Sequence, residues 1–212
     1  MEIFILLAGI ACFALTIIIH EVAHGWMADR LGDPTARLLG RLTLNPIPHI
    51  DMYGTIFLPL FLILIHSPFM FGWAKPVPVD PYNLKDPKKD SALISLAGPM
   101  ANMIIATILA IILKFMTNAV IAGLMLEVIQ FNVVLAIFNL IPVSPLDGEK
   151  ILVGILPKKE AYQYDKFMEQ YGLMLLAFII FPVSGGISLI SHFLYPIISL
   201  VLNLLVPGFG TI

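Results

Sequence analysis

Long apolar stretches alternate with short polar ones along this chain, and this pattern predicts a bundle of membrane helices. The apolar runs cover about residues 3–28, 52–71, 92–115, 120–141, 168–183 and 187–206. About 20 apolar residues are needed for a helix to cross a bilayer. We therefore expect an all-α polytopic membrane protein with about five spanning helices, in which one apolar run enters the membrane and turns back.

The polar segments after the first and second runs predict irregular or extended structure. Residues 37–44 have partly alternating character, which indicates a short strand. In residues 72–79 two prolines stand one residue apart, and this excludes a regular helix there. Met1 and Glu2 provide no basic region, so we expect residues 3–28 to be a retained helix and not a signal peptide.

Composition narrows the class of protein. Apolar residues make up 59% of the chain and charged residues only 12%, against about 25% charged in soluble domains. No soluble fold could cover so much apolar surface. The net charge of −2 indicates no class of partner, but the lack of a basic patch predicts no nucleic-acid partner. The single cysteine, Cys12, excludes an internal disulfide and a thiolate metal site.

The first apolar run carries the candidate chemistry, in the sequence His20-Glu21-Val22-Ala23-His24. Helix positions four apart share one face, so both histidines can bind one metal ion with Glu21 beside it. Imidazoles and carboxylates are costly in hydrocarbon and are seldom there without a function. This spacing is typical of metalloproteases. It predicts a metal hydrolase whose site lies within the membrane.

The basic residues indicate how the chain crosses the membrane. If residues 52–71 span, the 12 Lys and Arg residues divide four to eight between the two sides. If residues 52–71 turn back, eleven lie on the histidine side and only Lys114 lies opposite. Positive residues concentrate in the cytoplasm, so we expect the re-entrant topology and a site reachable from the cytoplasm. The alternative is that 52–71 spans and the proline segment crosses back, which is harder to satisfy in lipid.

The depth of the histidines follows from their distance to the end of the run. His24 lies six residues before Arg30, and His20 lies ten before it. At 1.5 Å per residue, the metal would lie roughly 9–15 Å below the cytoplasmic edge. Water can reach this depth from one side.

A catalytic zinc usually has three protein ligands and one open position, so a third ligand is needed. Asp147 follows the run that ends near Pro142, and re-entrant topology brings it to the histidine side. Gly148 would permit a sharp turn into a short helix over about 149–156. Asp147 could instead cap that helix, or do both. The rival ligands are His49, His66 and His192, with Asp51 a weaker one.

The whole chain resembles the site-2 proteases, which are zinc intramembrane metalloproteases of the M50 type, in their compact prokaryotic form. The resemblance rests on three motifs: 20–24, Ser95-Leu96-Ala97-Gly98-Pro99-Met100-Ala101-Asn102, and the Asn-x-x-Pro and Leu-Asp-Gly elements of 139–148. It implies that His20, His24 and Asp147 bind one Zn²⁺ and that Glu21 is the general base. It also implies that Asn139 contacts substrate. Asn102 is a tentative substrate contact, or equally an interhelical hydrogen bond.

The resemblance also implies a domain plan and a substrate. We expect residues 1–212 to form a single membrane-embedded metalloprotease domain, with a catalytic core over about 3–157 and accessory helices over about 168–206. Residues 72–90 are too few for a PDZ domain, and nothing after the last helix could form a CBS pair. The expected substrates are transmembrane segments of single-pass, membrane-anchored regulatory proteins. Extended segments such as 37–44 or 73–79 could receive them by strand addition.

Two other functions fit the same residues. A membrane metal-ion or proton transporter would use the intramembrane His, Glu and Asp groups as an ion pathway. A catalytically inactive scaffold would need none of them, and the intact motif with Asp147 argues against it. The expected location is the cell membrane, as a multi-pass protein in the lipid bilayer.

Overall fold

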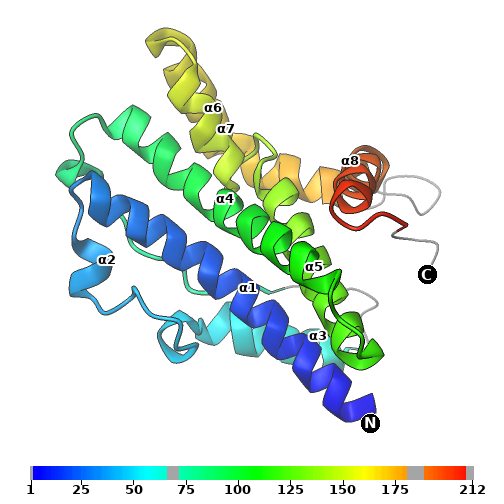
Figure 1. Ribbon diagram of the computed structural model, residues 1–212. Helices are drawn as coiled ribbons and strands as arrows, with labels where there is room; N and C mark the ends of the chain where they lie inside the picture. Colours follow the sequence, from blue (N-terminus) through cyan, green and yellow to red (C-terminus); the bar gives the residue numbers. More distant parts are fainter. Residues whose placement is uncertain (1, 66–71, 181–188, 209–212) are drawn as a thin grey trace.

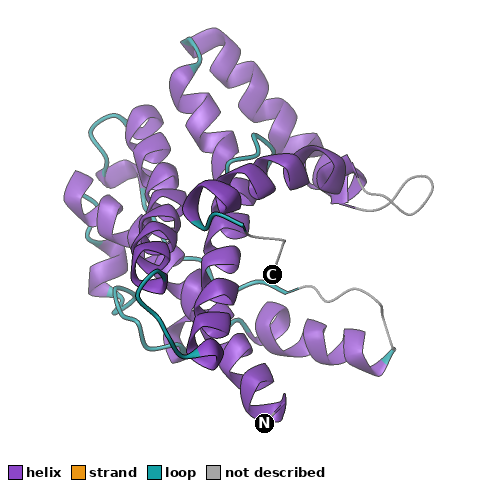
Figure 2. Ribbon diagram, turned by 45° about the vertical axis from the view of Figure 1, so that its right-hand side comes forward, coloured by secondary structure: helices purple, strands orange, loops and turns teal. Residues whose placement is uncertain are grey.

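The computed structural model describes residues 2–65, 72–180 and 189–208, and these ranges contain helices and loops but no β-strand (Figures 1 and 2). The helical elements are α1 (Glu2–Leu31), α2 (Thr35–Leu38), η1 (Ile47–His49), η2 (Met52–Phe57), α3 (Leu58–Leu64), η3 (Pro81–Asn83), α4 (Pro87–Leu113), α5 (Ala119–Asn139), α6 (Asp147–Ile155), α7 (Lys158–Ile180) and α8 (Leu189–Leu205). The expected all-α fold class is confirmed.

Three of these helices are long and apolar enough to cross a membrane, as befits a multi-pass membrane protein. They are the α1 stretch Leu7–Leu31, α4 and α5. The sequence predicted about five. Helix α7 begins with polar turns at Lys158, so its apolar part is short, while α8 has only 17 residues. The apolar helix Met52–Leu64 is shorter still.

Helices α1, α4 and α5 form the centre of the molecule, and their contacts fix their directions (Figure 1). His20 meets Asn102 and His24 meets Ile94, so α1 and α4 are antiparallel. Thr16 meets Asn132 and Phe13 packs on Phe131, and this contact order makes α5 parallel to α1. The chain between α1 and α4 therefore begins and ends at one end of the bundle, in agreement with the re-entrant topology.

Two apolar clusters hold these helices together. The larger one joins α4, α5 and α8 through Ala106, Ala110, Ile129, Val133 and Leu202, all nearly or fully buried. Its alanines let the helix backbones approach closely, as is usual between membrane helices. The other cluster, at the end where α1 finishes and α4 begins, consists of Ala28, Leu84 and Ile94.

The strand predicted over residues 37–44 is wrong. The side chain of Asp33 accepts hydrogen bonds from the backbone and hydroxyl of Thr35 and starts the single helical turn α2. Gly40, with φ of +65°, ends that turn, and bends follow it. Local side-chain-to-backbone bonding therefore prevails over the alternating pattern.

Residues 73–79 form no helix, as the prolines predicted, and we call them the extended segment. The N–H of Trp73 donates to the carbonyl of Gly54, and the N–H of Lys75 donates to the carbonyl of His49. Gly54 allows this approach, since a Cβ there would lie 2.3 Å from the Trp73 ring. These bonds fasten the extended segment to the loop that contains η1 and η2.

Candidate metal centre

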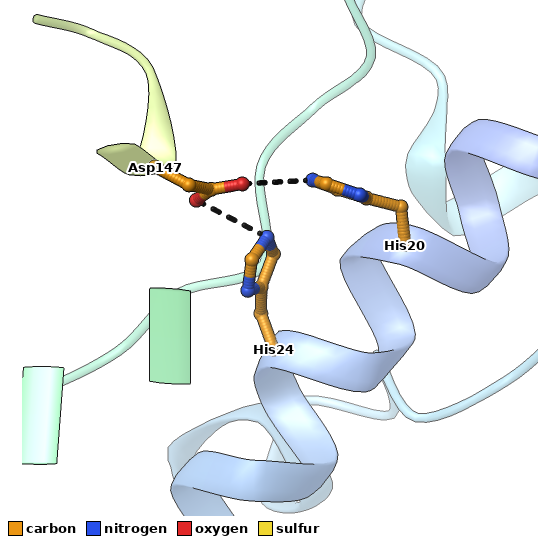
Figure 3. A group of neighbouring side chains, drawn as sticks. All are labelled: His20, His24 and Asp147. Atoms are coloured by element: carbon orange, nitrogen blue, oxygen red, sulfur yellow. Dashed lines mark hydrogen bonds and ion pairs between the residues drawn. The ribbon is translucent and has the colours of Figure 1, made fainter. Parts of the chain in front are cut away.

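Three side chains from two distant parts of the chain converge at the centre of the molecule (Figure 3). His20 and His24 project from one face of α1, and Asp147 is the first residue of α6. His20 Nε2 lies 3.0 Å from Asp147 Oδ2, and His24 Nε2 lies 3.3 Å from Asp147 Oδ1. One ligand atom from each residue falls within 4.8 Å of the others. The structure therefore brings together the three ligands expected from the sequence.

The histidine–aspartate distances suit a tetrahedral zinc ion. Zinc bonds of about 2.0–2.1 Å place neighbouring ligand atoms about 3.3 Å apart. The separations of 3.0 and 3.3 Å, each to a different oxygen of Asp147, are close to this value. Two imidazole nitrogens and one carboxylate oxygen are a donor set that zinc accepts. The three residues could therefore hold one metal ion.

Helix α4 lies directly behind the two histidines. The carbonyl of Ile94 lies 2.7 Å from His24 Nδ1, so this nitrogen carries a proton and Nε2 keeps its lone pair for a metal. A Cβ on Gly98 would lie 2.5 Å from the His24 ring and 2.7 Å from the His20 ring. Asn102 is fully buried, with Nδ2 3.4 Å from His20 Nδ1. Asn102 therefore bridges α4 and α1 and contacts the histidine's rear nitrogen.

Asp147 is positioned by close packing where α5 ends. Gly148 lies within α6, and a Cβ there would be 2.3 Å from the carbonyl oxygen of Leu140. The glycine is therefore needed for close approach, and the predicted sharp turn is wrong, since Gly148 has no positive φ. The N-cap residue of α6 is Leu146, so the alternative of Asp147 as N-cap is wrong too.

The side chain of Glu21 is held by the extended segment. The N–H of Val77 donates to Glu21 Oε2 at 2.9 Å. Because Pro76 and Pro78 have no N–H, Val77 carries the one backbone donor of this tripeptide. A Cβ on Gly25 would lie 2.7 Å from Val77 Cγ1, so α1 and the segment are in close contact.

Arg41 fastens the same segment from the other side. Its Nη2 donates to the carbonyls of Lys75 and Pro76, at 2.8 and 3.2 Å, and the side chain is largely buried. The sequence predicted neither the contact of Glu21 with Val77 nor the contacts of Arg41. For the first of these the Pro-Val-Pro pattern was the available signal, because it leaves a single N–H for Glu21 to bind.

The rival ligands that the structure describes are engaged elsewhere. His49 is buried, with Nε2 2.9 Å from the carbonyl of Thr43. Asp51 caps η2 by accepting from the backbone of Tyr53 and Gly54. His66 and the side chain of His192 lie outside the described residues. Among the described residues, His20, His24 and Asp147 are the one group of three that could hold a metal.

Asn139, expected to contact substrate, is half-buried in the last turn of α5. Its Nδ2 donates to the carbonyl of Leu135, four residues back, at 3.0 Å. This bond leaves the side-chain oxygen of Asn139 available to another group. Its contact with substrate stays a prediction.

Comparison with known proteins tests the resemblance to the M50 proteases. The model of peptidase family M50 matches residues 8–127, more than half of the chain. Over 190 residues the chain is 37% identical to the putative zinc metalloprotease YwhC of Bacillus subtilis, covering 85% of this chain and 80% of that protein. No solved structure matches.

Two further relatives are more distant and longer. The chain is 27% identical over 187 residues to the zinc metalloprotease MJ0392 of Methanocaldococcus jannaschii, covering 85% of this chain and 45% of that protein. It is 29% identical over 142 residues to the putative zinc metalloprotease Rip2 of Mycolicibacterium smegmatis, covering 66% of this chain and 53% of that protein. The chain thus spans about half the length of these two relatives. The family match and the identity to the Bacillus protein confirm the resemblance: the chain belongs to peptidase family M50.

Proposed function

We propose that this zinc metalloprotease of family M50 is an intramembrane endopeptidase that cleaves transmembrane segments of membrane-anchored regulatory proteins. One observation carries the proposal. The two histidines of an apolar helix, long enough to span the membrane, converge with Asp147 from a separate helix. A metal-ligand set at that position suits hydrolysis of a peptide bond within a membrane segment. The single-domain plan, with the catalytic core over about 3–157, belongs to the same proposal.

The geometry supports a role for each residue. His20, His24 and Asp147 would hold a zinc ion, which would supply a Lewis acid that lowers the pKa of water and polarises the scissile carbonyl. Glu21 accepts a proton from the attacking water and passes it to the leaving amine. The Val77 N–H holds one carboxylate oxygen of Glu21, which leaves the other oxygen for the water.

Fewer segments can bind substrate by strand addition than the sequence indicated. A helical substrate has its carbonyls hydrogen-bonded, so it must unwind before it is cleaved. Residues 37–44 form no strand that could receive it. In 76–78 the prolines donate nothing and the Val77 N–H is engaged by Glu21. We therefore expect strand addition at 76–78 to rely on the carbonyls of Val77 and Pro78, since Arg41 already donates to that of Pro76, with Asn139 contributing a polar contact.

The site is proposed to open toward the cytoplasm of a cell-membrane protein. The histidines lie within three turns of the end of α1 where Arg30, Arg37 and Arg41 follow. Helix α4 begins at the same end, beside Lys85, Lys88 and Lys89. Basic residues of this density are typical of the cytoplasmic face.

The test is cleavage of a single-pass transmembrane substrate by the purified protein in liposomes. We expect wild-type protein to cleave it, a chelator to stop cleavage and added zinc to restore it. Glu21→Gln should keep zinc and lose about 10²–10⁴-fold in rate, the usual contribution of a general base. Zinc-loaded protein that cleaves no substrate but carries zinc across the membrane would establish the transporter instead.

A further inference from the structure

We propose that Asn102 is a positioning residue whose side-chain oxygen accepts the Nδ1 proton of His20 and so presents His20 Nε2 to the metal. This inference rests on the proposed zinc site. It reassigns Asn102 from a tentative substrate contact to a residue that acts through His20.

The placement of Asn102 follows from the register between α1 and α4. Ile94, Gly98 and Asn102 are spaced by four and share one face of α4. The histidines are also spaced by four, and the helices are antiparallel. His24 therefore meets Ile94, His20 meets Asn102, and the ring edges pass over Gly98. Each histidine has one partner on α4 behind its Nδ1.

The amide of Asn102 is engaged differently from those of other asparagines in long helices. Asn132, Asn139 and Asn203 each donate Nδ2 to the carbonyl four residues back. Asn102 instead directs its amide at His20, from a position with no exposed surface. Because the Asn102 amide contacts His20 and not its own helix, we infer that this contact positions the His20 ring.

The metal decides which amide atom faces His20. A zinc-bound Nε2 has given its lone pair to the metal, so Nδ1 must carry the ring proton. A donor facing that proton would be repelled, and only the Asn102 oxygen can accept it. With Nδ2 facing His20, Oδ1 of Asn102 is buried without a partner. Amide oxygen and nitrogen differ only by a 180° rotation, and the rotated amide gives Oδ1 its donor.

The test compares zinc affinity among variants at two buried asparagines. Asn102→Leu removes the acceptor and should weaken zinc binding about 10–100-fold, the usual loss for such an outer partner. Asn102→Asp keeps an acceptor and should bind within a few-fold of wild type. Asn132→Leu is the matched control, since Asn132 is equally buried and bonds Thr16, one turn from His20. It should leave zinc affinity unchanged.

Two spectroscopic readouts keep the test independent of cleavage. With Co²⁺ bound in place of Zn²⁺, the visible absorption spectrum should change in Asn102→Leu and stay as in wild type in Asn132→Leu. In zinc-loaded wild-type protein, ¹⁵N spectra should show His20 protonated at Nδ1, and this measurement needs no variant to fold.

Specific outcomes overturn the inference. One is a zinc affinity and cobalt spectrum in Asn102→Leu that equal those of wild type. A second is an equal loss of zinc affinity in Asn102→Asp and Asn102→Leu. A third is a His20 protonated at Nε2 in the zinc-loaded form. Wild-type protein that binds no zinc would instead overturn the proposed function.

Discussion

At the residue scale, Gly98 lets α4 approach the two histidines, and its substitution tests how tightly the site is built. Its buried position leaves no room for a methyl group, since a Cβ would lie 2.5 Å from His24 Nε2. Gly98→Ala must displace the two rings from the positions in which they face Asp147. Overpacking costs about 1–3 kcal/mol, so we expect zinc affinity to fall about 10-fold or more, measured by competition with a chelator.

The control for this substitution is the same change on an exposed part of a neighbouring helix. Gly123, in α5, is exposed, and a Cβ there meets nothing within 4 Å. Gly123→Ala should leave zinc affinity unchanged and stabilise the helix by about 0.5–1 kcal/mol. Equal zinc affinity in both variants would show that Gly98 does not limit the site.

At the element scale, the extended segment 73–79 connects Arg41 with Glu21. We expect Arg41→Met to loosen the segment, because the Lys75 and Pro76 carbonyls lose their shared donor. The Val77 N–H would then hold Glu21 less firmly. Misplacing a catalytic group by about 1 Å costs up to about 10²-fold, so cleavage should fall about 10–100-fold while zinc content stays the same.

The matched control is a neighbouring arginine that does not touch the segment. Arg37 is exposed and its Nε bonds Asp29 at 2.9 Å. Arg37→Met should leave cleavage and zinc binding near wild type, since exposed ion pairs contribute about 0–1 kcal/mol. A loss of zinc in Arg41→Met would show that Arg41 supports the ligands and not only the segment.

The loop after α1 depends on a single buried carboxylate. Asp33 has no exposed surface and accepts from the N–H of Asp80 at 2.7 Å, from Asn83 Nδ2 at 2.9 Å and from Thr35. It thereby fixes the end of the extended segment to the end of α1. Replacing it leaves buried donors without an acceptor, so we expect Asp33→Asn to lower the unfolding free energy by about 1–3 kcal/mol.

The same carboxylate gives this stability a pH dependence. Burial acts to raise the pKa of Asp33, but the bonds from Thr35, Asn83 and Asp80 outweigh it and hold the pKa below its usual 3.8. A lowered folded-state pKa means that the stabilisation is complete above pH 3.8 and is lost as the pH falls through the folded value. The Tm difference between wild type and Asp33→Asn should therefore shrink below pH 3.8. A constant difference would contradict this.

At the scale of the whole molecule, the sequence predicted what depends on local spacing or on the sum of charges. The histidine pair follows from helical periodicity, and Asp147 followed once the basic residues indicated a re-entrant chain. The contacts of Ile94 with His24 and of Val77 with Glu21 were not predicted. They join residues 70 and 56 positions apart, and each uses a backbone group whose partner no side-chain pattern identifies. The number of spans stays a prediction, because three of the described helices are long and apolar enough to span while α7 combines polar and apolar turns in one helix.

The re-entrant topology makes a prediction about which residues face the same side of the membrane. In a Cys12→Ala background, single cysteines replace Arg37, Lys85 or Lys114, which are all exposed. Positions 37 and 85 lie between α1 and α4 at the histidine end, while 114 lies beyond the opposite end of α4. In intact cells an impermeant maleimide should label only position 114, and the other two should react after the membrane is opened.

The labelling outcomes test two claims separately: the re-entrant path and the cytoplasmic orientation of the site. Both were inferred from the distribution of the basic residues. Labelling of 37 and 114 from one side, with 85 on the other, would contradict the re-entrant path, because the chain between α1 and α4 would then cross the membrane. Labelling of 37 and 85 in intact cells, with 114 protected, would keep that path and reverse the orientation. The metal centre would then open to the outside, and a substrate would have to present its scissile bond from that face. The three cysteines thus decide the side from which water and substrate reach His20, His24 and Asp147, independently of any cleavage assay.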